Sequence, residues 1–286
     1  MFVTLALPQR SALPSSTWCA SHGSHRLLVQ GRRDAKGSTL PWQLWALCLA
    51  KPGFRRIRAL TRRQGYAAGE VIEVPPLTTE DEAIVVWLHG FGDTGQRWAG
   101  CVPALQQMGL PMLRFLFPTA PLTGVGSKEL RTSWFDLSTL DLTERRRQTP
   151  EQLLEGVDYV LHLVEPHVRR GISPGRVFLV GYSQGGGLAL ASALRAPRKI
   201  GGVLMLSSWV AEPLPSDFQD VPVHFFHGAE DPVVTLSGAK DDRQWLESRG
   251  LRTTFHAYPG MSHGVCDEEV QLDLVADIAQ TFYEAL

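Results

Sequence analysis

The 286-residue chain contains no asparagine, few cysteines and no long apolar stretch. Without asparagine it has no Asn-x-Ser/Thr acceptor for N-glycosylation. Its four cysteines, Cys19, Cys48, Cys101 and Cys266, lie far apart and form no CxxC pair. That spacing argues against a zinc site or a disulfide framework and favours a reducing compartment. The longest apolar run near the start, residues 44–50, is too short to span a bilayer, so we predict no transmembrane segment.

Charge is nearly balanced overall but unevenly distributed along the chain. The formal net charge is −1, so composition gives no reason to expect a nucleic-acid partner. Residues 1–69 carry eleven Lys or Arg and one acid, Asp34, whereas the remainder carries seventeen bases and twenty-eight acids. A basic, nearly acid-free N-terminal segment whose apolar residues show no periodicity is typical of an organelle transit peptide. A disordered extension and a misassigned start codon are the alternatives.

These features predict two regions. Residues 1–70 form a basic, acid-poor N-terminal extension, either disordered or a transit peptide, and residues 71–286 form one folded domain. We expect the protein in the cytoplasm, or in an organelle (mitochondrion or plastid) if the extension is a transit peptide.

From residue 70 onward, apolar runs alternate with helical patterns. Apolar residues at three- and four-residue steps predict helices over 153–168 and 270–282. Strands that alternate with helices predict an α/β fold with a mostly parallel central sheet and helices on both faces. The apolar runs that predict its buried strands are 83–88, 113–117, 176–180, 203–206, 221–226 and 253–258.

The stretch GYSQGG, residues 181–186, lies between one of these strands and a small-residue helical stretch. It matches G-x-S-x-G, the nucleophile elbow, in which a serine occupies a strained turn and glycines relieve crowding. The following helix N-terminus directs backbone N–H groups at developing negative charge. The pattern therefore predicts Ser183 as a nucleophile.

A serine hydroxyl needs a base and an orienting acid to attack a carbonyl group. In this fold class they follow the serine in the order acid, then histidine. Asp231 closes a polar turn after the strand that ends at Phe226, and His263 lies in the loop after the last strand. We predict His263 as general base and acid and Asp231 as its orienting partner. Glu230, beside Asp231, is the alternative acid.

An oxyanion also needs hydrogen-bond donors. The predicted donors are the backbone N–H groups of Gln184, which follows the nucleophile, and of Phe91, in the glycine-flanked turn after strand 83–88. Gln184 is thereby assigned a role through its backbone rather than its amide side chain. His89, in the same turn, is expected to fix the turn by hydrogen bonds. No metal or other cofactor is predicted.

Six motifs resemble, in order and spacing, those of the acyl-protein thioesterases, a family with lysophospholipase-like and carboxylesterase members. The resemblance covers about residues 80–286 and implies an α/β-hydrolase without a large lid or a cofactor. It places the family's triad on Ser183, Asp231 and His263 and its oxyanion donors on Phe91 and Gln184. The motifs are LHGFGDTG (88–95), PTAP (118–121), SWFD (133–136), GYSQGG (181–186), HGAEDPVV (227–234) and GMSHGVC (260–266).

The resemblance also implies cleavage of thioesters or oxyesters through an acyl-enzyme, with S-acylated proteins or small lipid esters as substrates. The leading hypothesis is an acyl-protein thioesterase that removes palmitoyl-type groups from protein cysteines. The alternatives are a lysophospholipase or short-chain carboxylesterase, and a catalytically silent binding protein. A homodimer is left open. Candidate residues for the family's apolar acyl channel, with plain packing as the alternative, are Leu122, Trp134, Phe135 and Trp209.

Overall fold

The computed structural model describes most of the chain after residue 67. The described residues are 55–58, 68–78, 83–107, 109–123, 130–137, 150–264 and 268–286. All of them belong to one compact unit that spans Pro41–Leu286. Most of the predicted extension, and the cysteines at 19, 48 and 266, lie outside the described residues, so the boundary near residue 70 stays a prediction.

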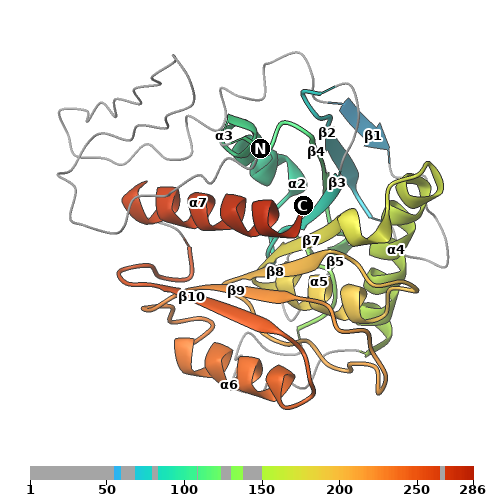
Figure 1. Ribbon diagram of the computed structural model, residues 1–286. Helices are drawn as coiled ribbons and strands as arrows, with labels where there is room; N and C mark the ends of the chain where they lie inside the picture. The colour runs from blue at the N-terminus through green and yellow to red at the C-terminus, as the bar shows by residue number, and fades with distance from the viewer. Residues whose placement is uncertain are drawn as a thin grey trace. The chain divides into compact units, whose positions relative to one another are not determined.

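An eight-stranded sheet forms the centre of this unit, in the order β1-β2-β4-β3-β7-β8-β9-β10 (Figure 1). β2 pairs antiparallel with β1 and with β4, whereas every other neighbouring pair is parallel. The mostly parallel sheet and the six predicted strands are confirmed, but β10, which was expected to be buried, is a partly exposed strand at the edge of the sheet. β1 and β2 were not foreseen. The strands are β1 (Arg55–Arg58), β2 (Glu70–Val74), β3 (Ala83–Leu88), β4 (Leu113–Pro118), β7 (Val177–Tyr182), β8 (Gly202–Leu206), β9 (Val223–Gly228) and β10 (Thr253–Tyr258).

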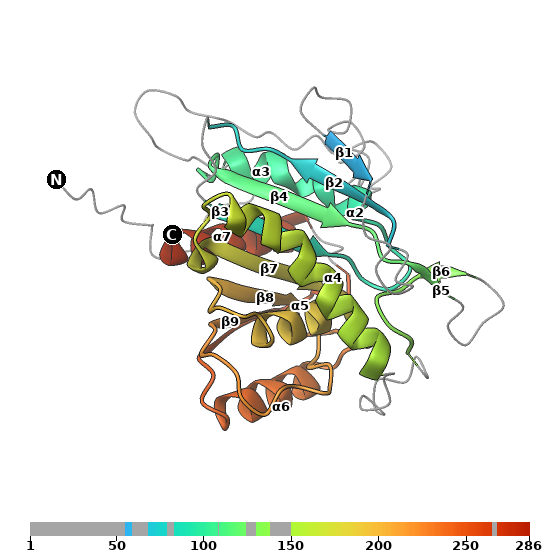
Figure 2. The same cartoon turned by 90° about the vertical axis from the view of Figure 1, so that its right-hand side faces the viewer.

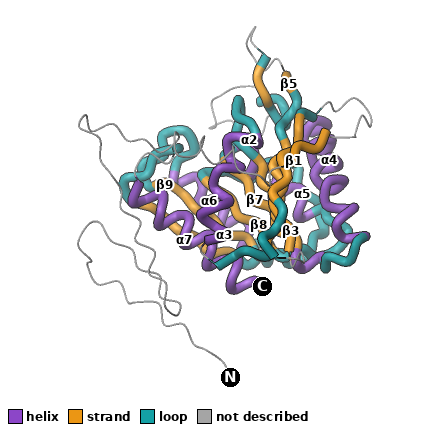
Figure 3. The backbone as a smooth tube through the Cα atoms, turned by 90° about the horizontal axis from the view of Figure 1, so that it is seen from above, coloured by secondary structure: helices purple, strands orange, loops and turns teal. Residues whose placement is uncertain are grey.

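Helices cover both faces of the sheet, as predicted. Figure 2 shows α4 and α5 on one face, and Figure 3 shows them running side by side. The short pair β5 (Leu122–Thr123) and β6 (Arg131–Thr132) forms a separate two-stranded sheet. The helices are α2 (Gly95–Trp98), α3 (Val102–Gln107), α4 (Pro150–Arg169), α5 (Gln184–Leu194), α6 (Leu236–Glu247) and α7 (Glu268–Ala285), with the 3-10 turns η1 (Ala99–Cys101) and η3 (Pro174–Arg176).

Two hydrophobic clusters, one on each face, hold these layers together. Residues of β3 alternate between them because successive strand side chains point to opposite faces. Ile84 and Val86 join the cluster that includes α4, α5 and α6, whereas Val85 and Trp87 join the cluster that includes α3 and α7. A strand buried on both faces accounts for the continuous apolar run AIVVWL.

None of the described helices combines the length and the apolarity needed to cross a membrane. Their amphipathic patterns explain their positions instead. On α4, Leu153, Val157 and Val160 recur at helical spacing and are buried against the sheet side. On α7, Ile278 and Phe282 occupy the predicted apolar stripe and are buried in the second cluster.

We expect Phe282→Ala to lower the free energy of unfolding by about 3–5 kcal/mol, the usual result of truncating a buried phenylalanine. The Phe282 ring is fully buried and packs edge-on against Phe178 of β7, with 5.2 Å between ring centroids. Urea denaturation measures the change. The exposed neighbour Gln280→Ala is the control and should stay within about 0.5 kcal/mol of the original chain. A similar loss in both variants would contradict the packing of α7.

Stability should also depend on pH through His224 of β9, whose ring bonds Thr254 on β10. Burial, reinforced by the nearby His256, lowers the pKa of His224 from 6.5 to about 4. Between these two values the unfolded chain takes up a proton that the folded chain does not, so stability falls as pH decreases from 6.5 to 4. His224→Gln should flatten that part of the curve of unfolding free energy against pH. A constant difference between the two proteins across this range would contradict the prediction.

Candidate active site

The predicted triad and the loop with the predicted donor Phe91 follow the carboxyl ends of parallel strands, where ligands gather in open α/β sheets. Ser183 follows β7, Asp231 follows β9, His263 follows β10 and Phe91 follows β3. The sheet order brings these loops to one edge, although the residues are far apart in sequence.

Ser183 occupies the strained turn between β7 and α5. Its φ of 51° and ψ of −120° place a non-glycine residue in a sparsely populated backbone region, which persists only when its surroundings enforce it. A side chain at Gly181 would overlap the Gly185 carbonyl oxygen, and one at Gly185 would overlap the Leu88 carbonyl oxygen. The glycines therefore permit strand and helix to meet closely enough to form the turn.

The structure brings Ser183, His263 and Asp231 into one hydrogen-bonded row. His263 Nε2 lies 3.0 Å from Ser183 Oγ, and His263 Nδ1 lies 2.8 Å from Asp231 Oδ2. When Nδ1 carries the ring proton and donates a hydrogen bond to Asp231, Nε2 is left as an acceptor for the serine hydroxyl. The arrangement can take a proton from Ser183 as its oxygen attacks an electrophile.

Asp231 is held in place by its own loop. Its Oδ1 accepts hydrogen bonds from the backbone N–H groups of Val233 and Val234, each at 2.8 Å, which leaves Oδ2 directed at His263. The Asp231 side chain is fully buried, whereas the alternative acid, Glu230, is exposed. The geometry therefore favours Asp231 over Glu230.

The two predicted oxyanion donors lie at matching positions just beyond the ends of the adjacent strands β3 and β7. Leu88 of β3 pairs with Gly181 of β7, and Phe91 and Gln184 each lie three residues beyond that pair. The loop that carries Phe91 packs against Ser183, since a Cβ on Gly90 would lie 3.4 Å from the Ser183 Cβ. Gln184 begins α5, so its N–H has no helical carbonyl partner and can be donated to a ligand.

The amide side chain of Gln184 has a role that the sequence prediction missed. It is fully buried: its Oε1 accepts from the Trp134 N–H at 3.1 Å, and its Nε2 donates to Phe135 O at 2.7 Å and to Ser133 Oγ at 2.9 Å. The expectation that Gln184 acts through its backbone rather than its amide is therefore incomplete. The amide ties the start of α5 to residues 133–135.

His89 fixes the turn after β3, as expected. Its Nδ1 bonds the Gly90 carbonyl at 2.7 Å, and its Nε2 accepts from the Ala120 N–H at 3.0 Å. Burial lowers the pKa of His89, in keeping with a neutral ring that donates on one side and accepts on the other. The Trp134 indole N–H donates to the His89 carbonyl at 2.7 Å, which joins this turn to the Gln184 network.

The four candidate channel residues have different environments. Trp134, Phe135 and Trp209 are almost completely buried in the hydrophobic cluster beneath α4 and α5, whereas Leu122 on β5 is 65% exposed. Trp134 packs within this cluster, and its indole N–H donates to the His89 carbonyl. The acyl channel stays a prediction. Across the described stretches, no group of three or more His, Cys, Asp or Glu is placed to hold a metal ion.

Comparison with known proteins places these features in context. The pattern of the Phospholipase/Carboxylesterase family matches residues 70–278. The chain is 36% identical over 196 residues to Probable carboxylesterase Os04g0669600 of Oryza sativa subsp. japonica, an alignment that covers 65% of this chain and 83% of that protein. It is 32% identical over 211 residues to Acyl-protein thioesterase 1 of Gibberella zeae, covering 68% of this chain and 89% of that protein.

The fold has counterparts among solved structures. A crystal structure of a variant of Arabidopsis thaliana SOBER1 superposes with a TM-score of 0.63 at 28% identity, and covers 71% of this chain and 99% of its own. Zea mays acyl-protein thioesterase 2 superposes with a TM-score of 0.58 at 24% identity, covering 74% of this chain and 98% of its own, which supports the fold alone.

Replacing Gln184 with methionine should test the buried amide network. The change keeps the backbone N–H and most of the side-chain volume but removes the hydrogen bonds of the amide to residues 133–135, whereas the bond from Ser133 Oγ to the Phe135 carbonyl remains. We expect the free energy of unfolding to fall by about 1–3 kcal/mol, measured by urea denaturation. The surface replacement Gln244→Met on α6 is the matched control and should change stability by less than about 0.5 kcal/mol. Equal stability of Gln184→Met and the original chain would refute the network's contribution.

Proposed function

The chain belongs to the phospholipase/carboxylesterase family, and from that membership we propose that Ser183, His263 and Asp231 form the catalytic triad of this serine-esterase-type hydrolase. The observation that carries the proposal is the row of hydrogen bonds from Ser183 Oγ through His263 to Asp231, at 3.0 and 2.8 Å. Ser183 lies in a strained turn directly before the first residue of α5, and this position supports the same assignment.

In the first half-reaction Ser183 Oγ attacks the acyl carbonyl carbon while its proton passes to His263 Nε2. Negative charge develops on the carbonyl oxygen, and the Phe91 and Gln184 N–H groups are the proposed donors that stabilise it. When the bond from carbon to the leaving sulfur or oxygen breaks, His263 gives its proton to the leaving group. The acyl group then remains on Ser183 as an ester.

In the second half-reaction a water molecule attacks the acyl carbon, and its proton passes to His263 Nε2. The bond between carbon and Ser183 Oγ breaks, His263 returns the proton to Ser183, and the carboxylic acid leaves. Asp231, fixed by two backbone N–H groups, stabilises the imidazolium that forms in both halves. Every proton transfer in this scheme uses groups of the chain, the substrate and water.

The proposed substrates are acyl thioesters on protein cysteines. Relatives named Acyl-protein thioesterase 1 in two fungi support this choice, each at 32% identity. The surroundings of the triad agree with a bulky carrier, because Val233, which bonds Asp231, and Gly264, which follows His263, are exposed. A protein-borne acyl group could therefore approach Ser183 from solvent.

Small carboxylic esters and lysophospholipids are the second candidate substrates. The relative with 36% identity is named as a carboxylesterase, and this observation favours the alternative. The chemistry at the acyl carbon is the same for both candidates, since they differ only in the leaving group.

We expect Ser183→Ala to reduce kcat/KM by about three to six orders of magnitude on every substrate that the protein cleaves, because the nucleophile is removed. The assay compares an S-palmitoylated peptide, lysophosphatidylcholine and p-nitrophenyl butyrate, with labelling by a fluorophosphonate as an independent measure of the nucleophile. The exposed Ser237→Ala on α6 is the matched control and should retain full activity.

Highest kcat/KM on the palmitoylated peptide would support the thioesterase proposal. Higher kcat/KM on the lysophospholipid or the short ester would replace it with the second candidate. If Ser183→Ala hydrolysed all three substrates as fast as the original chain, the assignment of the triad would be overturned.

A further inference from the structure

Tyr182, the residue before the nucleophile, contacts the loop that carries the general base. Its hydroxyl donates a hydrogen bond to the main-chain carbonyl of His263 at 2.8 Å. Its ring also lies against the His263 imidazole, with 5.3 Å between ring centroids. The contact joins the end of β7 to the loop after β10, 81 residues further along the chain.

The Tyr182 ring is held by its neighbours before it reaches His263. On one side it packs against Trp98, with 5.1 Å between centroids, and the Trp98 indole N–H donates to Asp93 at 2.9 Å. The Gly90 backbone fits closely against the same ring, since a Cβ on Gly90 would lie 2.8 Å from Tyr182 Cδ1. A ring packed in this way presents its hydroxyl at a fixed point.

Two hydrogen bonds therefore connect the elbow to the His263 loop, and they behave differently during the reaction. The bond between Ser183 Oγ and His263 Nε2 exists only while the serine hydroxyl is free. Once Ser183 is acylated, its oxygen has no proton to donate and that connection is lost. The bond from Tyr182 to the His263 backbone involves no reacting atom and persists through the acyl-enzyme stage.

We infer that Tyr182 is a positioning residue whose hydroxyl holds His263 in place while Ser183 carries the acyl group. This inference rests on the proposed triad. In the acyl-enzyme, His263 must accept a proton from water as the water oxygen bonds to the acyl carbon, and then pass that proton to Ser183 Oγ as the carbon–oxygen bond breaks. A base displaced by a fraction of an ångström performs this step less often, because general-base catalysis requires hydrogen-bond geometry.

Tyr182→Phe removes only the hydroxyl and keeps the packed ring. We expect deacylation to slow by about three- to tenfold, the effect of one neutral hydrogen bond, while acylation changes by less than about twofold. The measurement combines the steady-state kcat for p-nitrophenyl butyrate with intact-mass spectrometry of protein quenched during turnover, which gives the fraction of Ser183 that carries a butyryl group. In Tyr182→Phe, kcat should fall and the acylated fraction should rise. A residue with a merely structural role would lower kcat without raising that fraction.

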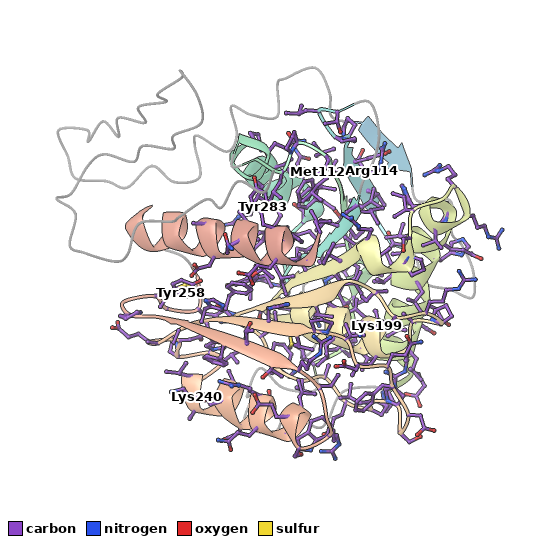
Figure 4. The ribbon with its side chains drawn as sticks, viewed as in Figure 1. Met112, Arg114, Lys199, Lys240, Tyr258 and Tyr283 are labelled. Carbon is purple, nitrogen blue, oxygen red and sulfur yellow. The ribbon has the colours of Figure 1, made fainter. Side chains whose placement is uncertain are left out.

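Tyr258→Phe is the matched control. Tyr258 ends β10 beside α7, where its hydroxyl bonds Asp277 at 2.8 Å (Figure 4). Its loss should leave both kcat and the acylated fraction unchanged. Thermal denaturation of the variants checks that they are folded, and the rate of fluorophosphonate labelling, which requires Ser183 and His263 but no deacylation, should be similar in all of them.

An acylated fraction that stays constant or falls in Tyr182→Phe would overturn the inference, and so would an equal rise in Tyr258→Phe. Failure of the proposed function gives a different result: no butyryl adduct on Ser183 and no labelling in the original protein. The two failures are therefore distinguishable.

Discussion

The close contact between the end of β7 and the start of α5 is the constraint on which the described site depends. Gly181 and Gly185 leave no room for a side chain between strand and helix, and this contact holds Ser183 at φ 51°. The Ser183 hydroxyl lies 3.0 Å from His263 Nε2, and Gln184, the next residue, begins α5. Further contacts surround this turn: Ser208 Oγ donates to the Ser183 carbonyl at 2.7 Å, and the Ser183 N–H donates to the Leu206 carbonyl at 2.9 Å.

Strands that are buried on both faces could be predicted because each is a short, continuous apolar run followed by a polar or glycine-rich turn. The same rule located most of the candidate site, since Ser183 and Asp231 each follow such a run. His263 follows β10, whose sequence TTFHAY mixes polar and apolar residues and whose side chains are mostly only partly buried. The short strands β1 and β2 escaped prediction. Their sequences, RRIR and EVIEV, are polar or alternating, and only pairing within the sheet makes them strands.

Side-chain networks were harder to predict than element positions. Nothing local in the sequence shows that the Gln184 amide reaches residues 133–135, about fifty positions earlier, because those partners are brought together only by tertiary packing. Burial of Trp134 likewise depends on the His89 carbonyl that it meets. Each network connects one loop of the site to another, so the loops hold positions that their own sequences do not specify.

The chain order of the proposed triad has a consequence for synthesis. Ser183 precedes His263 by 80 residues, and the base follows β10, a strand that pairs only with β9 among the described residues. At a translation rate of about 5–20 residues per second, the serine is made roughly 4–16 seconds before the histidine. During that interval the nascent chain carries the proposed nucleophile without its proposed base. The proposed site is therefore complete only after the loop that follows β10 has been synthesised.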